Sequence, residues 1–202
     1  MTKHTAPRKA TAEPLPKLTF HPLTPERWPD LEKLFGKNGA CGGCWCMWLK
    51  LPRKEFVAGK GEANREALKA IVAAGEVPGI LTYARGKPVG WCAVAPRDKH
   101  PIWDRSRNFK RIDDEPVWSI SCFFIAKPYR RRGMSRLLIE AAAAFVKRRG
   151  GRIVEGYPTD SSTQTVDPFV WTGMLSSFVA AGFKECARCS PTRPMVRLVL
   201  AK

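Results

Sequence analysis

The sequence predicts a single mixed α/β domain in which helices pack on a central mixed sheet. Two segments carry this prediction. Residues 134–146 repeat apolar side chains at helical spacing, and residues 117–126 alternate in character as a strand does. The chain has 202 residues, 44% of them hydrophobic, which is enough for one sizeable core. The predicted order of elements is β-α-α-β-β-β-α-β-α-β-β.

Residues 1–17 are rich in Thr, Pro, Ala and Lys and are predicted to be a disordered tail, so that the domain covers residues 18–202. A short strand is expected to open the domain. The helix after it has Thr24 as its N-cap and Pro25 in its first turn. A second helix is expected across residues 62–75, where small and apolar side chains share one face. These side chains are Ala63, Ala67, Ala70, Ile71 and Ala74.

Two strands across residues 79–96 are predicted to form a hairpin with its turn near Arg85-Gly86-Lys87. The polar stretch from Arg97 to Glu115 is expected to be a loop. The strand that follows is predicted to have one wholly buried face and one face that borders a site. The buried face would hold Trp118, Ile120, Cys122 and Phe124, and the other face Ser119 and Ser121.

The next helix has the clearest period in the chain, and Gly150-Gly151 is expected to stop it. Its predicted buried stripe is Met134, Leu137, Leu138, Ala141, Ala142, Phe145 and Val146. The remaining elements are predicted from shorter apolar stretches. They are a strand at 152–157, a helix at 173–182, and closing strands at 183–189 and 195–201.

Three consecutive arginines followed by a glycine stand at the start of this periodic helix. A strand that turns tightly into a helix leaves backbone N–H groups unpaired, and the helix dipole adds positive charge there. Gly133 lets a ligand approach the backbone, while Arg130, Arg131 and Arg132 can bind phosphate groups. Neither the P-loop pattern nor the dinucleotide fingerprint is present. The turn therefore predicts a site for a phosphate-bearing cofactor of another kind.

The stretch FFIAKPYRRRGMSRLLIEAA resembles the acetyl-CoA motif of the GNAT superfamily of N-acetyltransferases, Arg/Gln-x-x-Gly-x-Gly/Ala. The match is Arg130-x-x-Gly133-x-Ser135, in which serine replaces the final Gly or Ala. The predicted element order resembles the fold of this superfamily over residues 18–200. The stretches CGGCWCMW, DDEPVWSISCFF and EGYPTD resemble a bacterial subgroup of it. The resemblance implies an acetyl-CoA-dependent N-acetyltransferase.

The resemblance also implies how the cofactor lies. Backbone groups of Phe123, Phe124 and Ile125 would pair with the pantetheine arm, and a main-chain N–H near Ile125 would donate to the oxyanion. Amides of residues 131–136 would hold the pyrophosphate. A splay between this strand and residues 152–157 would admit the thioester. The expected cofactor residues are Phe123, Phe124, Ile125, Arg130, Arg131, Arg132, Gly133, Met134, Ser135 and Arg136.

The acid that protonates the leaving thiolate is usually a tyrosine in this superfamily, but Phe178 occupies its position here. Tyr157 is the best replacement, because it ends the strand that lines the slot. Glu155 lies on the same face of that strand and is a candidate base, as is Asp160 in the following loop. The other sources of an acid are solvent, Ser176 and Ser177.

The stretch CGGCWCMW, residues 41–48, allows three interpretations. Its side chains fill the core, or they wall the acceptor site, or two of its thiols join a distant Cys-x-x-Cys pair around zinc. The four thiols of that zinc site would be Cys41, Cys44, Cys186 and Cys189. No resident metal is predicted. The residues expected to border the acceptor are Trp45, Trp48, Ser119 and Ser121.

The net charge of +17 indicates that anions matter to this protein. A small amine is the leading acceptor, and an aminoacyl-tRNA or an acidic protein, held by the basic stretch at residues 97–114, is a second. A non-catalytic module that binds nucleic acid or zinc is a third hypothesis, but no standard nucleic-acid motif supports it. We expect a monomer or a homodimer.

The seven cysteines and the lack of an apolar stretch near the N-terminus favour a cytoplasmic protein with reduced thiols. No run of apolar residues approaches the length of a membrane span. No membrane partner is therefore expected.

Overall fold

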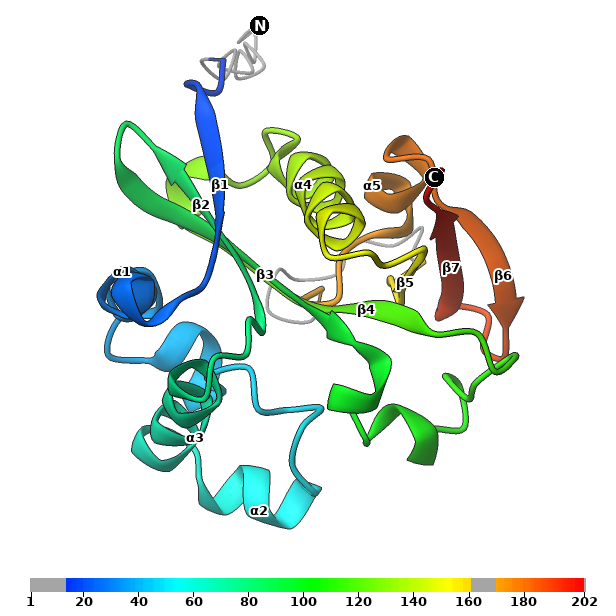
Figure 1. The fold of residues 1–202 in the computed structure, drawn as a ribbon, viewed down its shortest axis with the longest axis horizontal. Coiled ribbons are helices and arrows are strands. Elements are labelled where there is room, and N and C mark those ends of the chain that lie inside the picture. The colour runs from blue at the N-terminus through cyan, green and yellow to red at the C-terminus, as the bar shows by residue number, and fades with distance from the viewer. Residues whose placement is uncertain (1–13, 161–169, 202) are drawn as a thin grey trace, which may run out of the picture.

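The computed structural model describes residues 14–160 and 170–201. It is built on one seven-stranded sheet with the order β1-β2-β3-β4-β5-β7-β6 (Figure 1). Neighbouring strands are antiparallel except β4 and β5, which are parallel. The strands are β1 Leu18–Pro22, β2 Gly79–Ala84, β3 Lys87–Pro96, β4 Val117–Ile125, β5 Ile153–Gly156, β6 Lys184–Arg188 and β7 Pro194–Val199. The prediction of a mixed α/β fold is confirmed.

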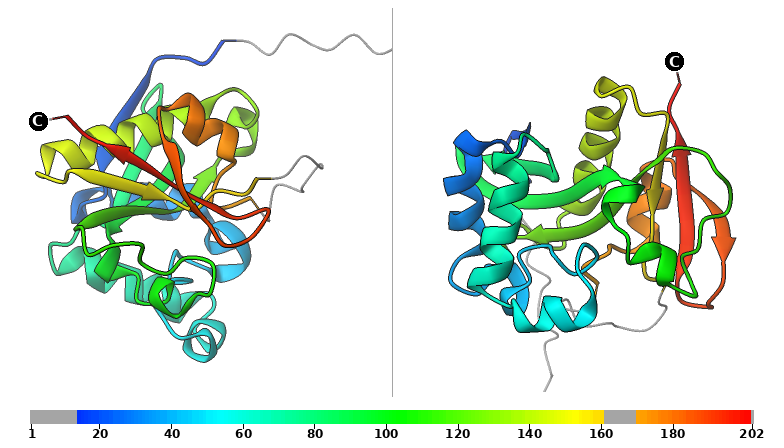
Figure 2. Two further views of the ribbon diagram at one scale, coloured as in Figure 1. Left: turned by 90° about the vertical axis from the view of Figure 1, so that its right-hand side faces the viewer. Right: turned by 60° about the horizontal axis from the view of Figure 1, so that its bottom comes forward.

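Helices cover both faces of this sheet, with α4 and α5 on one face and the group α1 to α3 on the other (Figures 1 and 2). The helices are α1 Trp28–Phe35, α2 Arg53–Ala58, α3 Glu62–Ala73, α4 Met134–Arg148 and α5 Leu175–Ala180. Leu138, Ala142 and Val146 of α4 are fully buried against the sheet. Burying one Leu or Val side chain stabilises a fold by about 1.5–3 kcal/mol, so this stripe anchors α4.

The α4 helix connects the two parallel strands, and its period follows the prediction. Gly150 has a φ of +78° and follows the last turn, as expected for the residue that stops a helix. Of the nine residues of β4, only 117–120 pair with β5. Because β4 continues to Ile125, the two strands part beyond this short ladder, and the rest of the β4 edge lacks β5 as a neighbour.

The predicted faces of β4 are wrong beyond Ile120. A β-bulge at Ser121 shifts the register of β4 against β3. An extra residue in one strand moves every later side chain to the opposite face. Ile120 and Phe123 therefore both pack on the α4 side, whereas Cys122 and Phe124 pack on the side of α1.

The second predicted helix is present as α3, but its predicted alanine-rich face is wrong. The buried side chains are Asn64, Leu68 and Val72, which follow one another at four-residue spacing. Leu and Val bury more apolar area than Ala, so the helix turns them toward the sheet. The Asn64 side chain donates to the Phe56 carbonyl at 3.1 Å and so ties α3 to α2, a short helix that the sequence did not predict.

The predicted hairpin is confirmed, with its turn at Arg85 and Gly86, whose φ values are +49° and +72°. Two positive φ values match a two-residue turn of the type that suits the twist of a hairpin. The stretch at 97–115 is a loop that contains two short 3₁₀ turns.

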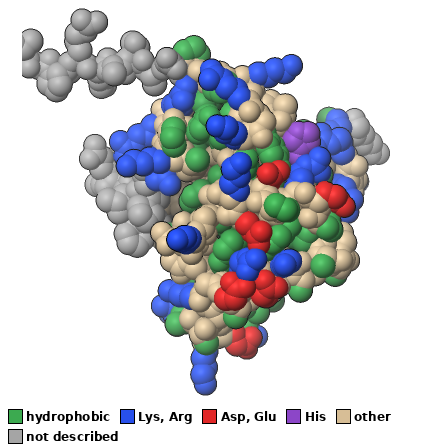
Figure 3. All heavy atoms as spheres, turned by 90° about the vertical axis from the view of Figure 1, so that its left-hand side faces the viewer, with side chains coloured by type: hydrophobic (Ala, Val, Ile, Leu, Met, Phe, Trp, Pro, Cys, Tyr) green, Lys and Arg blue, Asp and Glu red, His purple; other side chains and the backbone are tan. Residues whose placement is uncertain are grey.

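Residues 14–17 of the predicted tail run along the domain, and Leu15 packs against the core on the α4 side. The rest of that tail lies outside the described residues. Within 14–160 and 170–201, no helix has the length and apolar character needed to cross a bilayer. Figure 3 shows the face with α1 and α3, on which Lys and Arg side chains are scattered rather than gathered in one patch.

Candidate active site

A pocket of about 430 Å³ opens where β4 leads into the turn before α4. The end of β4, this turn and residues 170–174 form its walls. Its lining is Ala40, Cys41, Phe123, Phe124, Ile125, Arg130, Arg131, Ser135, Val170, Trp171, Gly173 and Met174. The pocket thus gathers Phe123 to Ile125 with Arg130, Arg131 and Ser135, all expected at the cofactor. The other expected cofactor residues, outside the lining, are Arg132, Gly133, Met134 and Arg136.

The start of α4 carries the positive end of the helix dipole. No side chain caps this end, and no acidic residue lies in the first turn. The first-turn N–H groups therefore lack intrahelical acceptors and add to the dipole of a 15-residue helix. Gly133 has a φ of +77°, a left-handed conformation that favours glycine, and the space where a Cβ would stand is open. Together with the arginines this is a suitable place for a phosphate group.

The β4 edge beyond the first four residues is open on the side away from β3. The Ala126 N–H donates to the Val89 carbonyl at 2.9 Å. Because orientation alternates along an antiparallel ladder, backbone groups of Phe124 also face β3, whereas those of Phe123 and Ile125 face the opening. The backbone of Phe124 is therefore used by β3, contrary to the expectation that it would pair with a pantetheine arm. Its side chain still lines the pocket.

Residues 170–174, here called the strap, cross this opening. The Phe123 N–H donates to the Trp171 carbonyl at 2.7 Å. On the other side, the Thr159 N–H donates to the Gly173 carbonyl at 2.8 Å. The strap thus bridges β4 and the end of β5. Both backbone positions that face the opening already have one partner, because the Ile125 carbonyl accepts from Arg130 Nε at 2.8 Å.

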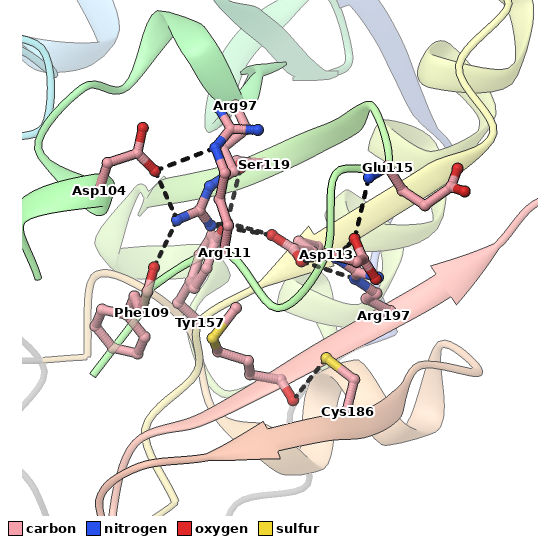
Figure 4. A network of polar contacts seen from close by, with 12 residues as sticks. Arg97, Asp104, Phe109, Arg111, Asp113, Glu115, Ser119, Tyr157, Cys186 and Arg197 are labelled. Carbon is pink, nitrogen blue, oxygen red and sulfur yellow. Dashed lines mark hydrogen bonds and ion pairs between the residues drawn. The ribbon is translucent and has the colours of Figure 1, made fainter. Parts of the chain in front are cut away.

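The hydroxyl of Tyr157 lies in a buried polar network rather than in the lining of the pocket (Figure 4). It contacts Arg97 Nη1 at 2.7 Å, Glu155 Oε2 at 2.7 Å and Ser119 Oγ at 2.9 Å. Burial, ahead of the neighbouring Glu155 carboxylate, raises the pKa of Tyr157. A phenol with a raised pKa and a fully buried side chain is poorly placed to give a proton to a substrate.

Glu155, the candidate base, is 1% exposed and is paired with two arginines. Its carboxylate lies 3.2 Å from Arg97 and 2.7 Å from Arg197. These contacts hold the carboxylate inside the network, and Glu155 is not part of the lining of the pocket. Asp160, the other candidate base, forms an ion pair with Arg188 at 2.8 Å.

Phe178, at the position of the usual tyrosine, is fully buried in the core. Its ring packs edge-to-face with Phe123, 6.0 Å between centroids, and with Phe183 at 5.1 Å. It therefore supports the wall of the pocket without supplying a proton donor. Ser176 and Ser177 precede Phe178 on α5 and are not part of the lining of the pocket.

The tryptophans expected at the acceptor have different environments. Trp45 is buried and stacks on Trp28 with 6.2 Å between centroids, so it is a core residue. Trp48 is 37% exposed and packs edge-on against Trp171 of the strap at 6.1 Å, so it stands behind the wall of the pocket. Ser119 contacts Tyr157 as described, and Ser121 is buried at the bulge.

The four thiols of the hypothetical zinc site are not gathered together. Cys41 lines the pocket, whereas Cys186 lies on β6 at the far edge of the sheet and donates to the Met195 carbonyl. Over residues 14–160 and 170–201, no group of three or more His, Cys, Asp or Glu side chains is arranged to hold a metal ion. All seven cysteines are free thiols.

Reasoning from the sequence missed the strap, which supplies Val170, Trp171, Gly173 and Met174 to the pocket. The available signal was an apolar, aromatic stretch placed between a polar loop and a short helix. It also missed the role of Arg97, which was expected in a polar loop and is 2% exposed.

Comparisons with known proteins agree with this architecture. Residues 45–165 match the family model of the acetyltransferase (GNAT) family. No curated protein sequence is similar enough to match. A GNAT-family acetyltransferase of Listeria monocytogenes has a TM-score of 0.57 at 11% identity, with 95% of this chain and 99% of that chain covered.

Two other structures contain a coenzyme. The PaiA N-acetyltransferase of Thermoplasma acidophilum, solved with coenzyme A, has a TM-score of 0.52 at 12% identity, with 91% and 99% covered. The yncA protein of Salmonella typhimurium, solved with its cofactor acetyl-CoA, has a TM-score of 0.52 at 11% identity, with 92% and 95% covered. At these identities the likeness concerns the fold. Because the family model spans more than half of the sequence, this chain belongs to the GNAT family of acetyltransferases.

Proposed function

We propose that this protein is an acetyl-CoA-dependent N-acetyltransferase that acts on an amine of a small molecule. The observation that carries the proposal is one pocket in which an open strand edge meets an uncapped helix N-terminus flanked by Arg130 and Arg131. An extended amide chain suits the strand edge, and a pyrophosphate suits the helix. The coenzyme complexes of two proteins with this fold add support.

The first turn of α4 holds the pyrophosphate through the amides of Met134, Ser135 and Arg136, and the arginines before it add charge. The side chain of Met134 is buried in the core, so it contributes through its backbone alone. The pantetheine arm donates to the Ile125 carbonyl, which also accepts from Arg130 Nε at 2.8 Å and has a second lone pair. The Ile125 N–H remains available for the carbonyl oxygen of the thioester. Pairing at Phe123 as well requires the Trp171 carbonyl to give way.

The reaction is direct transfer. The amine nitrogen forms a bond to the acetyl carbon, the carbon–sulfur bond breaks, the amine loses one proton, and the thiolate of coenzyme A gains one. The Ile125 N–H, which faces the opening, stabilises the negative charge on the carbonyl oxygen. Tyr157 and Glu155 support the end of β5 within their network, and water at the pocket takes and gives the protons.

Titration calorimetry with acetyl-CoA tests the proposal, and a matched pair of variants locates the site. Ser135→Glu puts a carboxylate into the pocket at the start of α4, where an acidic residue favours the helix. We expect this variant to fold at least as well as the wild type and to lose acetyl-CoA binding by roughly 100-fold or more, because like charges meet without solvent between them.

Ala144→Glu is the control, because it introduces the same carboxylate at an exposed position of the same helix. We expect it to bind acetyl-CoA as the wild type does. Equal affinity in the wild type and in Ser135→Glu would refute the site. A wild type that binds no acetyl-CoA would refute the proposed function.

A further inference from the structure

Arg193 stands in the turn between β6 and β7, half-buried at the end of the sheet. Its Nη1 donates to Thr159 Oγ1 at 3.1 Å, and its Nη2 donates to the Tyr157 carbonyl at 3.4 Å. The guanidinium also lies 5.3 Å from the centroid of the Phe109 ring. These contacts fix the position of the group and leave further donors, because a guanidinium carries five N–H bonds in a planar fork.

Unlike Arg97 and Arg197, Arg193 has no carboxylate partner among the described residues. Arg97 pairs with Glu155, and Arg197 pairs with Glu155 and Asp113. Over the part of the chain that the structure describes, no Asp or Glu forms an ion pair with Arg193. Burial lowers its pKa, and no neighbouring charge offsets this effect. A guanidinium remains charged in a protein, so an uncompensated one in a half-buried place indicates a ligand.

Arg193 belongs to the side of the sheet opposite α4. Met195 and Arg197 have the same parity along the chain and pack on the face opposite α4. The proposed phosphate site is on the α4 side. Arg193 is not part of the lining of the pocket, but its partner Thr159 donates its N–H to the carbonyl of Gly173, which is part of it.

A cluster of aromatic side chains connects the wall of the pocket to Arg193. Trp171 lines the pocket and packs against the cluster that contains Phe109 and Tyr157, and Arg193 lies over the Phe109 ring. The described lining of the pocket contains Arg130 and Arg131 and no carboxylate. A lining without a carboxylate offers no partner to a polycationic acceptor.

We propose that Arg193 binds a carboxylate of the acceptor, so that the substrate is an amine that also carries a carboxylate, as an amino acid does. This inference rests on the proposed acetyl transfer and deepens it. The planar guanidinium suits a carboxylate through two parallel hydrogen bonds. The amine of the same molecule then reaches the thioester across Trp171.

The test is a panel of the proteinogenic amino acids and their primary carboxamides, assayed with acetyl-CoA for release of the coenzyme A thiol. Each pair differs only in the charge that Arg193 would recognise. We expect the wild type to prefer the acid by roughly 10–100-fold in kcat/KM, as for a hydrogen bond to a charged group. Arg193→Met should abolish this preference, mainly through a higher KM for the acid, and Arg193→Lys should restore part of it.

Arg188→Met is the matched control in the same hairpin, since Arg188 is exposed and already paired with Asp160 and Glu185. It should keep the preference. Calorimetry with acetyl-CoA shows that each variant is folded and still loads its cofactor. A purely structural role for Arg193 would lower activity toward acids and amides alike, which would overturn the inference.

Two further outcomes would also overturn it. One is a wild type that accepts amides as readily as acids, and the other is a wild type that binds acetyl-CoA but accepts no acid in the panel. In both cases the proposed acetyl transfer stands. Failure to bind acetyl-CoA would instead remove the proposed function itself.

Discussion

At the scale of single residues, the hydroxyl of Tyr157 shows how a polar side chain becomes part of the framework. It accepts from Arg97 and contacts Ser119 and Glu155, all within 2.9 Å. Its ring stacks on Trp103 with 4.1 Å between centroids. The hydroxyl and the ring are both engaged in contacts within the protein, so the side chain stabilises the end of β5.

Tyr157→Phe tests this interpretation. The change removes one hydroxyl and leaves Arg97, Ser119 and Glu155 with an unfilled partner, so the free energy of unfolding should fall by about 1–3 kcal/mol. Acetyl-CoA affinity should not change, and kcat with the best amine of the panel should stay within about threefold, because solvent carries the protons. The measurements are urea denaturation and steady-state kinetics. A 100-fold fall in kcat at unchanged stability would assign Tyr157 the role of the acid.

At the scale of elements, the loop at residues 97–115 is held in place from within. Arg97, 2% exposed, reaches Asp104 and the Phe109 carbonyl of its own loop as well as Glu155 of β5. Removing one partner of a buried ion pair costs more than the pair gains, because a bare charge stays behind. The loop is therefore a docked element, and its hydrogen bonds keep Phe109 under Arg193.

The stability of this docked loop should depend on pH through His100. Burial, with the charges of Lys50 and Arg97 nearby, lowers the pKa of His100 to about 3 in the folded protein. The unfolded chain has the ordinary pKa of about 6.5 and binds the proton first as the pH falls. Stability is therefore fully present above pH 6.5 and decreases below it, by at most about 1.4 kcal/mol per pH unit.

Urea denaturation between pH 7 and pH 5 measures this slope, in a range where the carboxylates contribute little. In His100→Gln the slope over that interval should flatten, whatever the change in absolute stability. His21→Gln is the control, because that ring lies on β1, away from the loop. An equal slope in wild type and His100→Gln would exclude His100 as the cause.

At the scale of the whole molecule, the two faces of the sheet carry different groups of charged residues. The α4 face presents the helix N-terminus and arginines that suit a phosphate, whereas the opposite face carries the network of buried ion pairs and Arg193. The parting of β4 from β5 joins the two sides through one pocket. Cys41 lies in the segment that follows α1, and this segment forms part of the pocket wall.

Thiol labelling should report this arrangement. Cys41, Cys186 and Cys189 are exposed, so a thiol reagent should modify them rapidly in the native protein, and the other four thiols more slowly. Saturating acetyl-CoA should slow labelling of Cys41, which lines the pocket, and leave the two others unchanged. Peptide mapping by mass spectrometry distinguishes them. Protection of all three thiols together, reversed by a chelator, would instead support the zinc hypothesis.

The sequence by itself determined the order of the strands and main helices along the chain and located the turn that we propose to bind phosphate. Both follow from local rules: the period of α4, the hairpin at Arg85 and Gly86, and the combination of arginines with Gly133 need only neighbouring residues to be recognised. The same local pattern indicated a phosphate-bearing cofactor, and the resemblance of this stretch to the GNAT superfamily implied acetyl-CoA. The faces of α3 and β4 were not determined, because burial of larger side chains and one bulged residue decide them.

Only the tertiary structure decided what surrounds the opening between β4 and β5. The strap around Trp171, the burial of Tyr157 and the uncompensated charge of Arg193 depend on segments that are far apart in sequence and meet at the sheet. Whether a charged group is paired depends on what folding brings within 4 Å of it. A sequence records each arginine alike, and its carboxylate partner, or the lack of one, exists only once the chain is folded.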